Sequence, residues 1–127
     1  MLIICLKRAR DNQMNPAKKA PDWQTQLIHE VMAYIEAHID QELDFEQISK
    51  AHHISMSHFR KLFKEVSGMP PVEYVNRVRI LRSLELLQTT RKSIAEIAAA
   101  VGIHDQNYYA RLFKKMIGCS PSYYKSV

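Results

Sequence analysis

Residues 93–124, SIAEIAAAVGIHDQNYYARLFKKMIGCSPSYY, place a short helical pattern, a turn and a longer helical pattern in succession. Ser93 is a favoured helix N-cap, and Glu96 stands where a carboxylate can bond back to the cap amide. Apolar residues then recur on one side of a helix about two turns long. A turn at 101–104 precedes a second amphipathic stretch, which ends at Gly118, a residue suited to the left-handed conformation at helix ends. This order predicts a helix, a tight turn and a second helix.

The pattern occurs twice, so the chain contains an internal repeat. Six residues recur at an offset of fifty positions, namely Leu62, Phe63, Lys64, Gly68, Pro71 and Tyr74 as Leu112, Phe113, Lys114, Gly118, Pro121 and Tyr124. Upstream the offset is 49, because one residue is gained near positions 104 and 105. There Asp44 takes the N-cap position of Ser93, and Gln47 takes the position of Glu96. We therefore expect two units built on the same plan.

Further helices are predicted before, between and after the two units. Residues 72–88 contain no proline or glycine, which predicts one connecting helix about 25 Å long. Its apolar residues recur at helical spacing, at Val75, Val78, Leu81, Leu84 and Leu87. An amphipathic helix before the first unit is predicted from apolar residues at every fourth position, namely Trp23, Leu27, Val31, Ile35 and Ile39. Pro121 is expected at the first position of a last short helix.

The glycine content points to the same fold class. Three glycines in 127 residues argue against a turn-dense β domain and against a glycine-rich phosphate loop. Long helices with short connections need few glycines. We therefore expect an all-α fold.

Charge is distributed unevenly along the chain. The formal net charge is +5, from 18 Lys and Arg against 13 Asp and Glu. Residues 1–22 carry +3, residues 23–55 carry −5, residues 56–92 carry +5 and residues 93–127 carry +2. An acidic segment followed by a strongly basic one is what a protein with one polyanion-binding surface shows. Ordinary solvated helix faces would give the same pattern, so charge alone leaves both interpretations open.

Several functional classes lack support in the sequence. Cys5 and Cys119 lie far apart without metal or redox spacing, which favours a reducing compartment. His52, His53 and His58 do not indicate a metal site, because adjacent histidines in a turn point apart and no carboxylate or cysteine completes the set. No catalytic arrangement occurs at meaningful spacing, so we expect neither an enzyme nor a cofactor. The start of the chain fits neither a signal peptide nor a membrane span.

The two units and their connecting helix resemble the C-terminal DNA-binding domain of AraC/XylS-type bacterial transcription regulators. The resemblance covers about 23–124, and its strongest part consists of Ser93 to Ala98, Val101 to Ile103, Arg111 to Lys115, Gly118 and Ser120 to Tyr124. It implies seven helices in two helix-turn-helix subdomains, with the third and sixth as recognition helices joined through a long central helix. His53 stands where the first turn usually has a residue that tolerates positive φ. His104 and Asn107 replace the more usual small hydroxyl residues.

The resemblance also implies a domain organisation. Residues 23–127 are expected to form the double helix-turn-helix domain, with the first unit at about 23–71, the linker helix at 72–88 and the second unit at 93–125. Residues 1–22 have the pattern of a helix end followed by a polar linker. We expect them to be the remnant of a missing N-terminal effector or dimerisation domain. A complete short regulator is the alternative.

The resemblance, together with the exposed helix faces it implies, indicates the base contacts. On the first recognition helix the family's base-contacting positions match Ser57, Arg60 and Lys61, flanked by Met56 and His58. The corresponding residues on the second are Gln106, Asn107 and Arg111, flanked by His104 and Tyr108. Arginine and lysine donate to guanine, whereas glutamine and asparagine bond an adenine edge in a bidentate way. Asp105 would repel phosphate, so we expect it to stabilise the helix start instead.

Sequence-independent contacts to DNA are expected from helix starts and basic side chains. Such contacts neutralise phosphates and position the protein on the duplex. The candidates are Ser55, Lys64, Arg91, Lys92, Ser93, Lys114 and Lys115.

The function expected is that of a sequence-specific transcription regulator, whose two recognition helices enter successive major-groove segments of an asymmetric site of about 20 bp. Double-stranded DNA and RNA polymerase are the expected partners, no membrane is involved, and the expected location is the bacterial cytoplasm, on the nucleoid when bound. The alternative is a helical module that acts on RNA polymerase or a partner regulator without specific DNA affinity. Steeply salt-dependent DNA binding would favour the regulator.

Overall fold

The computed structural model describes residues 23–125, and every regular element within that range is a helix. In chain order the helices are α2 (Trp23–Ala37), α3 (Phe45–Ala51), α4 (Met56–Ser67), α5 (Pro71–Thr89), α6 (Ile94–Ala100), α7 (Gln106–Ile117) and α8 (Pro121–Tyr124). The predicted all-α class with seven helices is confirmed for this part of the chain. The helix end and linker predicted over 1–22 lie outside the described residues.

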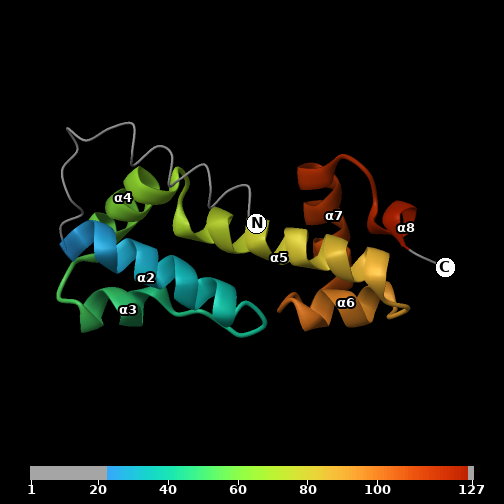
Figure 1. Ribbon diagram of the computed structural model, residues 1–127, viewed down its shortest axis with the longest axis horizontal. Coiled ribbons are helices and arrows are strands. Elements are labelled where there is room, and N and C mark those ends of the chain that lie inside the picture. The colour runs from blue at the N-terminus through green and yellow to red at the C-terminus, as the bar shows by residue number, and fades with distance from the viewer. Residues whose placement is uncertain (1–22, 126–127) are drawn as a thin grey trace.

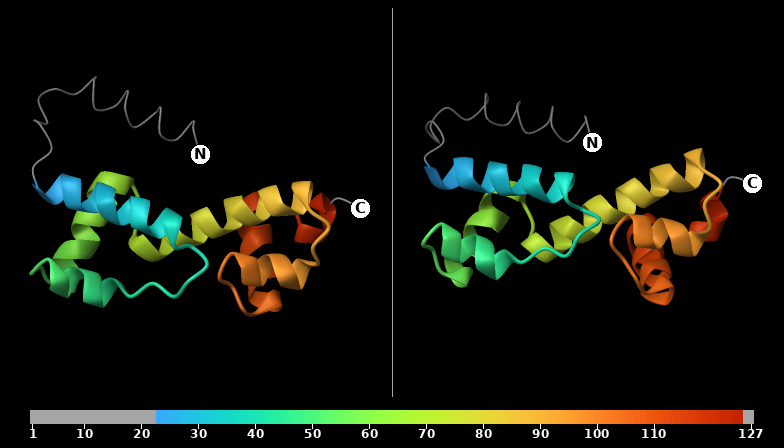
Figure 2. Two further views of the ribbon diagram at one scale, coloured as in Figure 1. Left: turned by 60° about the horizontal axis from the view of Figure 1, so that its bottom comes forward. Right: turned by 90° about the horizontal axis from the view of Figure 1, so that it is seen from below.

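Helix α5 connects two units of similar construction (Figure 1). In the first unit, α2 and α3 pack on α4, which packs on α5. In the second unit, α6, α7 and α8 all pack on α5. The two turned views show the same elongated arrangement, with α2 to α4 at one end and α6 to α8 at the other (Figure 2). Each unit has its own hydrophobic core.

The first core is organised around buried aromatic side chains. The ring of Phe63 lies between those of Phe59 and Tyr74, at centroid distances of 5.9 and 5.5 Å. Leu27 and Val31 from α2 join this cluster, as the spacing in the sequence predicts. Such aromatic pairs add stability beyond the area they bury.

The second core repeats this arrangement with the equivalent residues. The ring of Phe113 lies between those of Tyr109 and Tyr124, at centroid distances of 5.8 and 5.9 Å. Each of these residues follows its counterpart in the first core by fifty positions. The repeat seen in the sequence is therefore a repeat of side-chain packing.

Helix α5 contributes to both cores, and its buried face changes along its length. Val78 lies in the first core, whereas Ile80 and Leu87 lie in the second. Ile80 is fully buried although it lies outside the predicted stripe, and Leu81 and Leu84 within that stripe are only half-buried. The difference arises because a single-sided stripe assumes one packing partner, and α5 has two.

The helix starts of the second unit are capped as expected. Ser93 accepts a bond from the Glu96 amide at 3.1 Å, and Glu96 accepts from the Ser93 amide at 2.8 Å. Asp105 caps α7 by accepting from the amides of Asn107 and Tyr108 at 2.9 and 3.2 Å. The predicted role of Asp105 in stabilising the helix start is confirmed.

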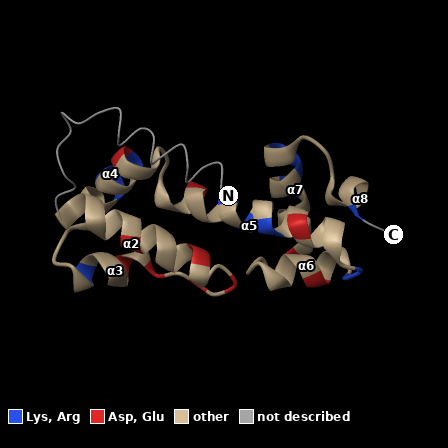
Figure 3. Ribbon diagram, viewed as in Figure 1, with Lys and Arg blue, Asp and Glu red and all other residues tan. Residues whose placement is uncertain are grey.

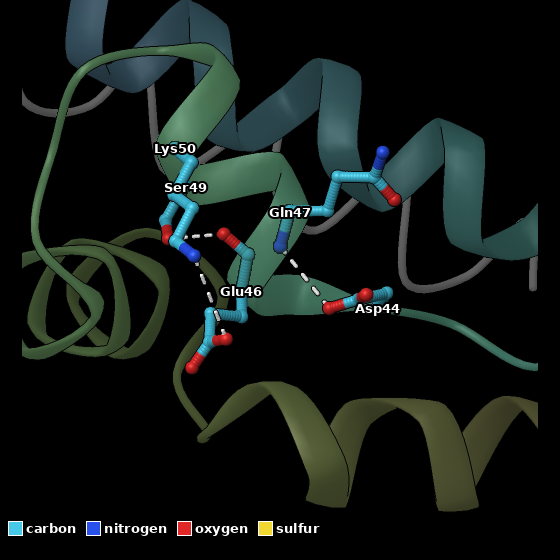
Figure 4. A network of polar contacts seen from close by, with 5 residues as sticks. All are labelled: Asp44, Glu46, Gln47, Ser49 and Lys50. Carbon is cyan, nitrogen blue, oxygen red and sulfur yellow. Dashed lines mark hydrogen bonds and ion pairs between the residues drawn. The ribbon is translucent and has the colours of Figure 1, made fainter.

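The first unit has half of this capping exchange (Figure 4). Asp44 accepts from the Gln47 amide at 3.1 Å, but the described hydrogen bonds include none from the Asp44 amide to the Gln47 side chain. A neutral amide oxygen is a weaker acceptor than the carboxylate that the second unit uses. The nearby ion pair of Lys50 with Glu46, at 3.9 Å, is exposed and adds little.

Two helices differ in extent from the prediction. Helix α2 ends at Ala37, so Ile39 is buried from the following loop rather than from the helix. Trp23, predicted on the apolar stripe, is 60% exposed because it begins the helix at the edge of the core. Helix α5 extends one residue beyond the prediction at each end and has Pro71 at its first position.

Candidate nucleic-acid interface

Helix α4 exposes the side chains that the resemblance selects. The caps and the apolar spacing start the helix at Met56 and turn Phe59 and Phe63 into the core. The opposite face is therefore solvent-exposed, and it carries Ser57, His58, Arg60, Lys61 and Lys64. Met56 differs from the other candidates, since it is half-buried and packs against the first core.

Helix α7 exposes the matching face in the second unit. Tyr109 and Phe113 are fully buried. The candidates on the other side are all exposed, namely Gln106, Asn107, Tyr108, Arg111, Lys114 and Lys115. His104 is exposed just before the helix, and Tyr108 leaves 42% of its surface open to solvent. Each unit thus presents one polar helix face that no other described element covers.

The remaining candidates lie at helix starts. Ser55 caps α4 by accepting from the His58 amide at 3.1 Å, and Ser93 caps α6 in the same way. The Ser55 hydroxyl still has a proton to donate, and the helix N-terminus favours a nearby anion. Arg91 and Lys92 are exposed immediately before Ser93. The features that suit a phosphate group are thus the Ser55 hydroxyl at the start of α4 and the two basic side chains before α6.

Charged residues separate between the elements (Figure 3). Six of the seven acidic residues of the first unit lie on α2, on α3 or on the loop between them, and the seventh, Glu65, lies on α4. The six are Glu30, Glu36, Asp40, Glu42, Asp44 and Glu46. Basic residues occur on α4, on α7 and before α6, together with those on α5. The uneven charge of the sequence therefore becomes an uneven charge of the molecule.

Two arginines in the basic segment at residues 56–92 have a structural role, whereas their charge alone suggests a contact with DNA. Arg79 donates to the backbone oxygens of Ile39 and Gln41, and Arg82 donates to that of Glu36 at 2.7 Å. Burial lowers the pKa of the Arg79 guanidinium below its usual range. These two arginines hold the end of α2 and its following loop against α5. Sequence reasoning missed this role, because neither residue carries a local signal for a partner about forty positions away.

The capping carboxylate has a shifted pKa. Hydrogen bonds from the Ser93 amide and hydroxyl lower the pKa of Glu96 below its ordinary value of 4.5. Glu96 is therefore ionised at neutral pH and complements the positive end of α6.

Other kinds of site find no support in the described part of the chain. There, no group of three or more histidine, cysteine or acidic residues could hold a metal ion. The Nδ1 atom of His52 instead lies 3.0 Å from the backbone oxygen of Ile48. No helix among residues 23–125 is long and apolar enough to cross a membrane.

Comparison with known proteins identifies the class. A family model described as "Helix-turn-helix domain" matches residues 48–126. The transcriptional activator AarP of Providencia stuartii is 30% identical over 86% of this chain and 81% of its own length. The chain belongs to the AraC/XylS family of helix-turn-helix transcription regulators. Membership places it among transcription regulators.

Solved structures give the same result for the fold. The C-terminal domain of AraT, a response regulator from Geobacillus stearothermophilus, superposes with a TM-score of 0.73 at 29% identity, covering 78% of this chain and 83% of that domain. The DNA-binding domain of AdpA, determined in complex with a target DNA, superposes with a TM-score of 0.71 at 26% identity, covering 76% of this chain and 87% of that one. Other curated relatives are longer, and the chain spans 30% of one and 39% of another.

Proposed function

We propose that this chain binds double-stranded DNA by inserting α4 and α7 into successive major-groove segments of one asymmetric site. The observation that carries the proposal is the pair of exposed, polar and basic helix faces, each backed by an equivalent aromatic core. The complex of AdpA with its target DNA supports it, since that domain has the same fold. Two different helices read two different sequences, so the site has no twofold symmetry and a single chain suffices.

The base contacts follow from side-chain chemistry. In the proposal, Arg60 and Lys61 donate to guanine and Ser57 adds an adaptable contact. On α7, Gln106 and Asn107 bond adenine edges and Arg111 donates to guanine. Flanking contacts come from Met56, His58, His104 and Tyr108. Because Met56 packs against the core, its exposed part is limited to an apolar contact with a thymine methyl group.

The phosphate contacts supply affinity without sequence preference. We assign them to the two capping serines and to basic residues at helix ends, namely Ser55, Lys64, Arg91, Lys92, Ser93, Lys114 and Lys115. Each lysine or arginine that neutralises a phosphate releases counterions, so binding weakens steeply as salt rises.

RNA polymerase is the protein partner that we propose. AarP is named a transcriptional activator, and an activator acts on transcription initiation at the DNA where it is bound. The acidic surface of α2 and α3 lies on elements that the proposed DNA contacts do not use. Such a regulator works on chromosomal DNA in the bacterial cytoplasm.

Two binding experiments test the proposal. Selection from random duplexes should enrich a site of about 20 bp with two unlike conserved segments. Titration of salt against binding to that site and to random duplex should give steep slopes for both and a higher affinity for the selected site. Weak, salt-insensitive binding to every duplex would instead support a helical module that acts on protein partners alone.

A further inference from the structure

The loop after α2 reaches across to the second unit. Both views in Figure 2 show the connection between α2 and α3 close to the turn that follows α6. Arg79 holds this loop from α5, through Nε to the Ile39 oxygen at 3.1 Å and Nη2 to the Gln41 oxygen at 3.0 Å. The loop therefore has a defined position beside the second unit.

Gly102 in the turn after α6 lies directly against this loop. A Cβ atom at this position would be 2.7 Å from the Ile39 backbone oxygen and 3.0 Å from Nη2 of Arg79. Contacts below about 3 Å are not tolerated without movement, and a backbone oxygen held by an arginine has little freedom to move. The glycine thus allows the two units to approach each other closely.

The equivalent residue of the first unit shows that a turn of this kind can be built without glycine. His53 occupies that position with φ 59°, and its side chain is exposed. Histidine is one of the residues that tolerate positive φ. Gly102 has φ 88°, so both turns use the left-handed region. Gly102 differs from His53 in its larger φ and in the neighbouring loop of the other unit.

Extensive packing among the described helices does not join the two units directly. Every extensive packing between described helices lies within one unit or involves α5. Beside the contact at Gly102, a cleft separates the units and is lined by Ala37 and Asp40 from the first, Arg82 from α5 and Ala100 from the second. The relative orientation of α4 and α7 therefore depends on α5 and on the contact between loop and turn.

We propose that the contact of Gly102 with Ile39 and Arg79 fixes the orientation of α7 relative to α4, and so selects the separation of the two DNA segments read together. The proposal rests on the proposed function, because it concerns how the two recognition helices share one site. Two linked binding elements gain from their connection only when the geometry lets both engage at once. A fixed orientation therefore penalises a site whose two segments are too close or too far apart.

The test uses two variants, each with a matched control. Gly102→Ala introduces the Cβ that meets Ile39, whereas Gly118→Ala introduces one at φ 104° with nothing within 4 Å. Both substitutions impose the same kind of backbone strain, but only the first disturbs the contact. Arg79→Met removes the bonds to the loop, and Arg77→Met removes an exposed arginine from the same helix.

Binding is measured on the selected duplex and on duplexes with one or two base pairs inserted or deleted between the two segments. Wild type and both controls should lose about tenfold in affinity for each base-pair change, and both contact variants should lose less than about threefold. If Gly102→Ala and Arg79→Met lost as much affinity for each base-pair change as wild type does, the proposal would be overturned. The proposal would also be overturned if Gly118→Ala reduced the dependence of affinity on spacing as much as Gly102→Ala does, because backbone strain alone would then account for the effect.

A second measurement uses the free protein without DNA, and it does not depend on whether Gly102→Ala folds. Residual dipolar couplings of the free protein report the relative orientation of the two units. Arg79→Met should change that orientation or average it, while Arg77→Met should leave it as in wild type. An unchanged orientation in Arg79→Met would overturn the inference. If wild-type protein selects no DNA sequence, the proposed function fails, and these couplings still decide whether the contact orients the units.

Discussion

Arg60 and Arg111 stand on the exposed faces of different recognition helices, so their loss should affect different halves of the DNA site. Arg60→Ala should relax the base preference at the segment read by α4, and Arg111→Ala at the segment read by α7. Each should weaken specific binding by about 1 to 3 kcal/mol. Selection from random duplexes with both variants checks this prediction, and each variant is the control for the other. Unchanged preferences in both would remove these residues from base recognition.

Lys64 lies in the last turn of α4 and is expected to behave differently. Lys64→Ala should weaken binding to all sequences alike and reduce the slope of log affinity against log salt by about one. The slope is measured on the selected site and on random duplex in parallel. A loss confined to the selected site would instead indicate a base contact.

The capping box makes α6 sensitive to acid. Because the folded-state pKa of Glu96 lies below its ordinary value of 4.5, its ionised form stabilises the fold above that pH, and this contribution is lost as pH falls through the folded-state pKa. Wild type should therefore be more stable than Glu96→Gln near neutral pH, with the difference vanishing in acid. Urea unfolding at a series of pH values measures it. A difference that is independent of pH would show that the charge contributes nothing.

The helices and their exposed faces were predictable because both depend on local information. Ser93 with Glu96 and Asp105 mark helix starts within three residues, and the apolar period that defines the core also defines the opposite face. The changing buried face of α5 could not be obtained in this way, since it depends on which unit lies beside each turn. The roles of Arg79 and Arg82 depend on folded contacts in the same manner.

At the scale of the molecule, two cores joined by one helix should lose stability separately. Phe113 is fully buried in the second core, and Phe113→Ala should remove about 3 to 5 kcal/mol there. Amide hydrogen exchange should then accelerate in α6, α7 and α8 while α2 and α4 keep their protection. Phe63→Ala is the matched substitution in the first core and should give the reverse pattern. Uniform loss of protection in either variant would show that the two units unfold as one.

The length of α5 also predicts the shape of the bound DNA. Its 19 residues span about 28 Å, which is less than the roughly 34 Å that separates successive major-groove segments on one face of B-DNA. If α5 stays rigid, both recognition helices can engage fully only when the DNA bends towards the protein, at a cost that the additional contacts offset. Energy transfer between dyes at the two ends of a duplex should therefore rise on binding of wild type. Arg111→Ala, which weakens engagement of the second unit, should produce a smaller rise at saturation. Straight DNA in a complex whose two segments are both protected from cleavage would contradict a rigid connecting helix.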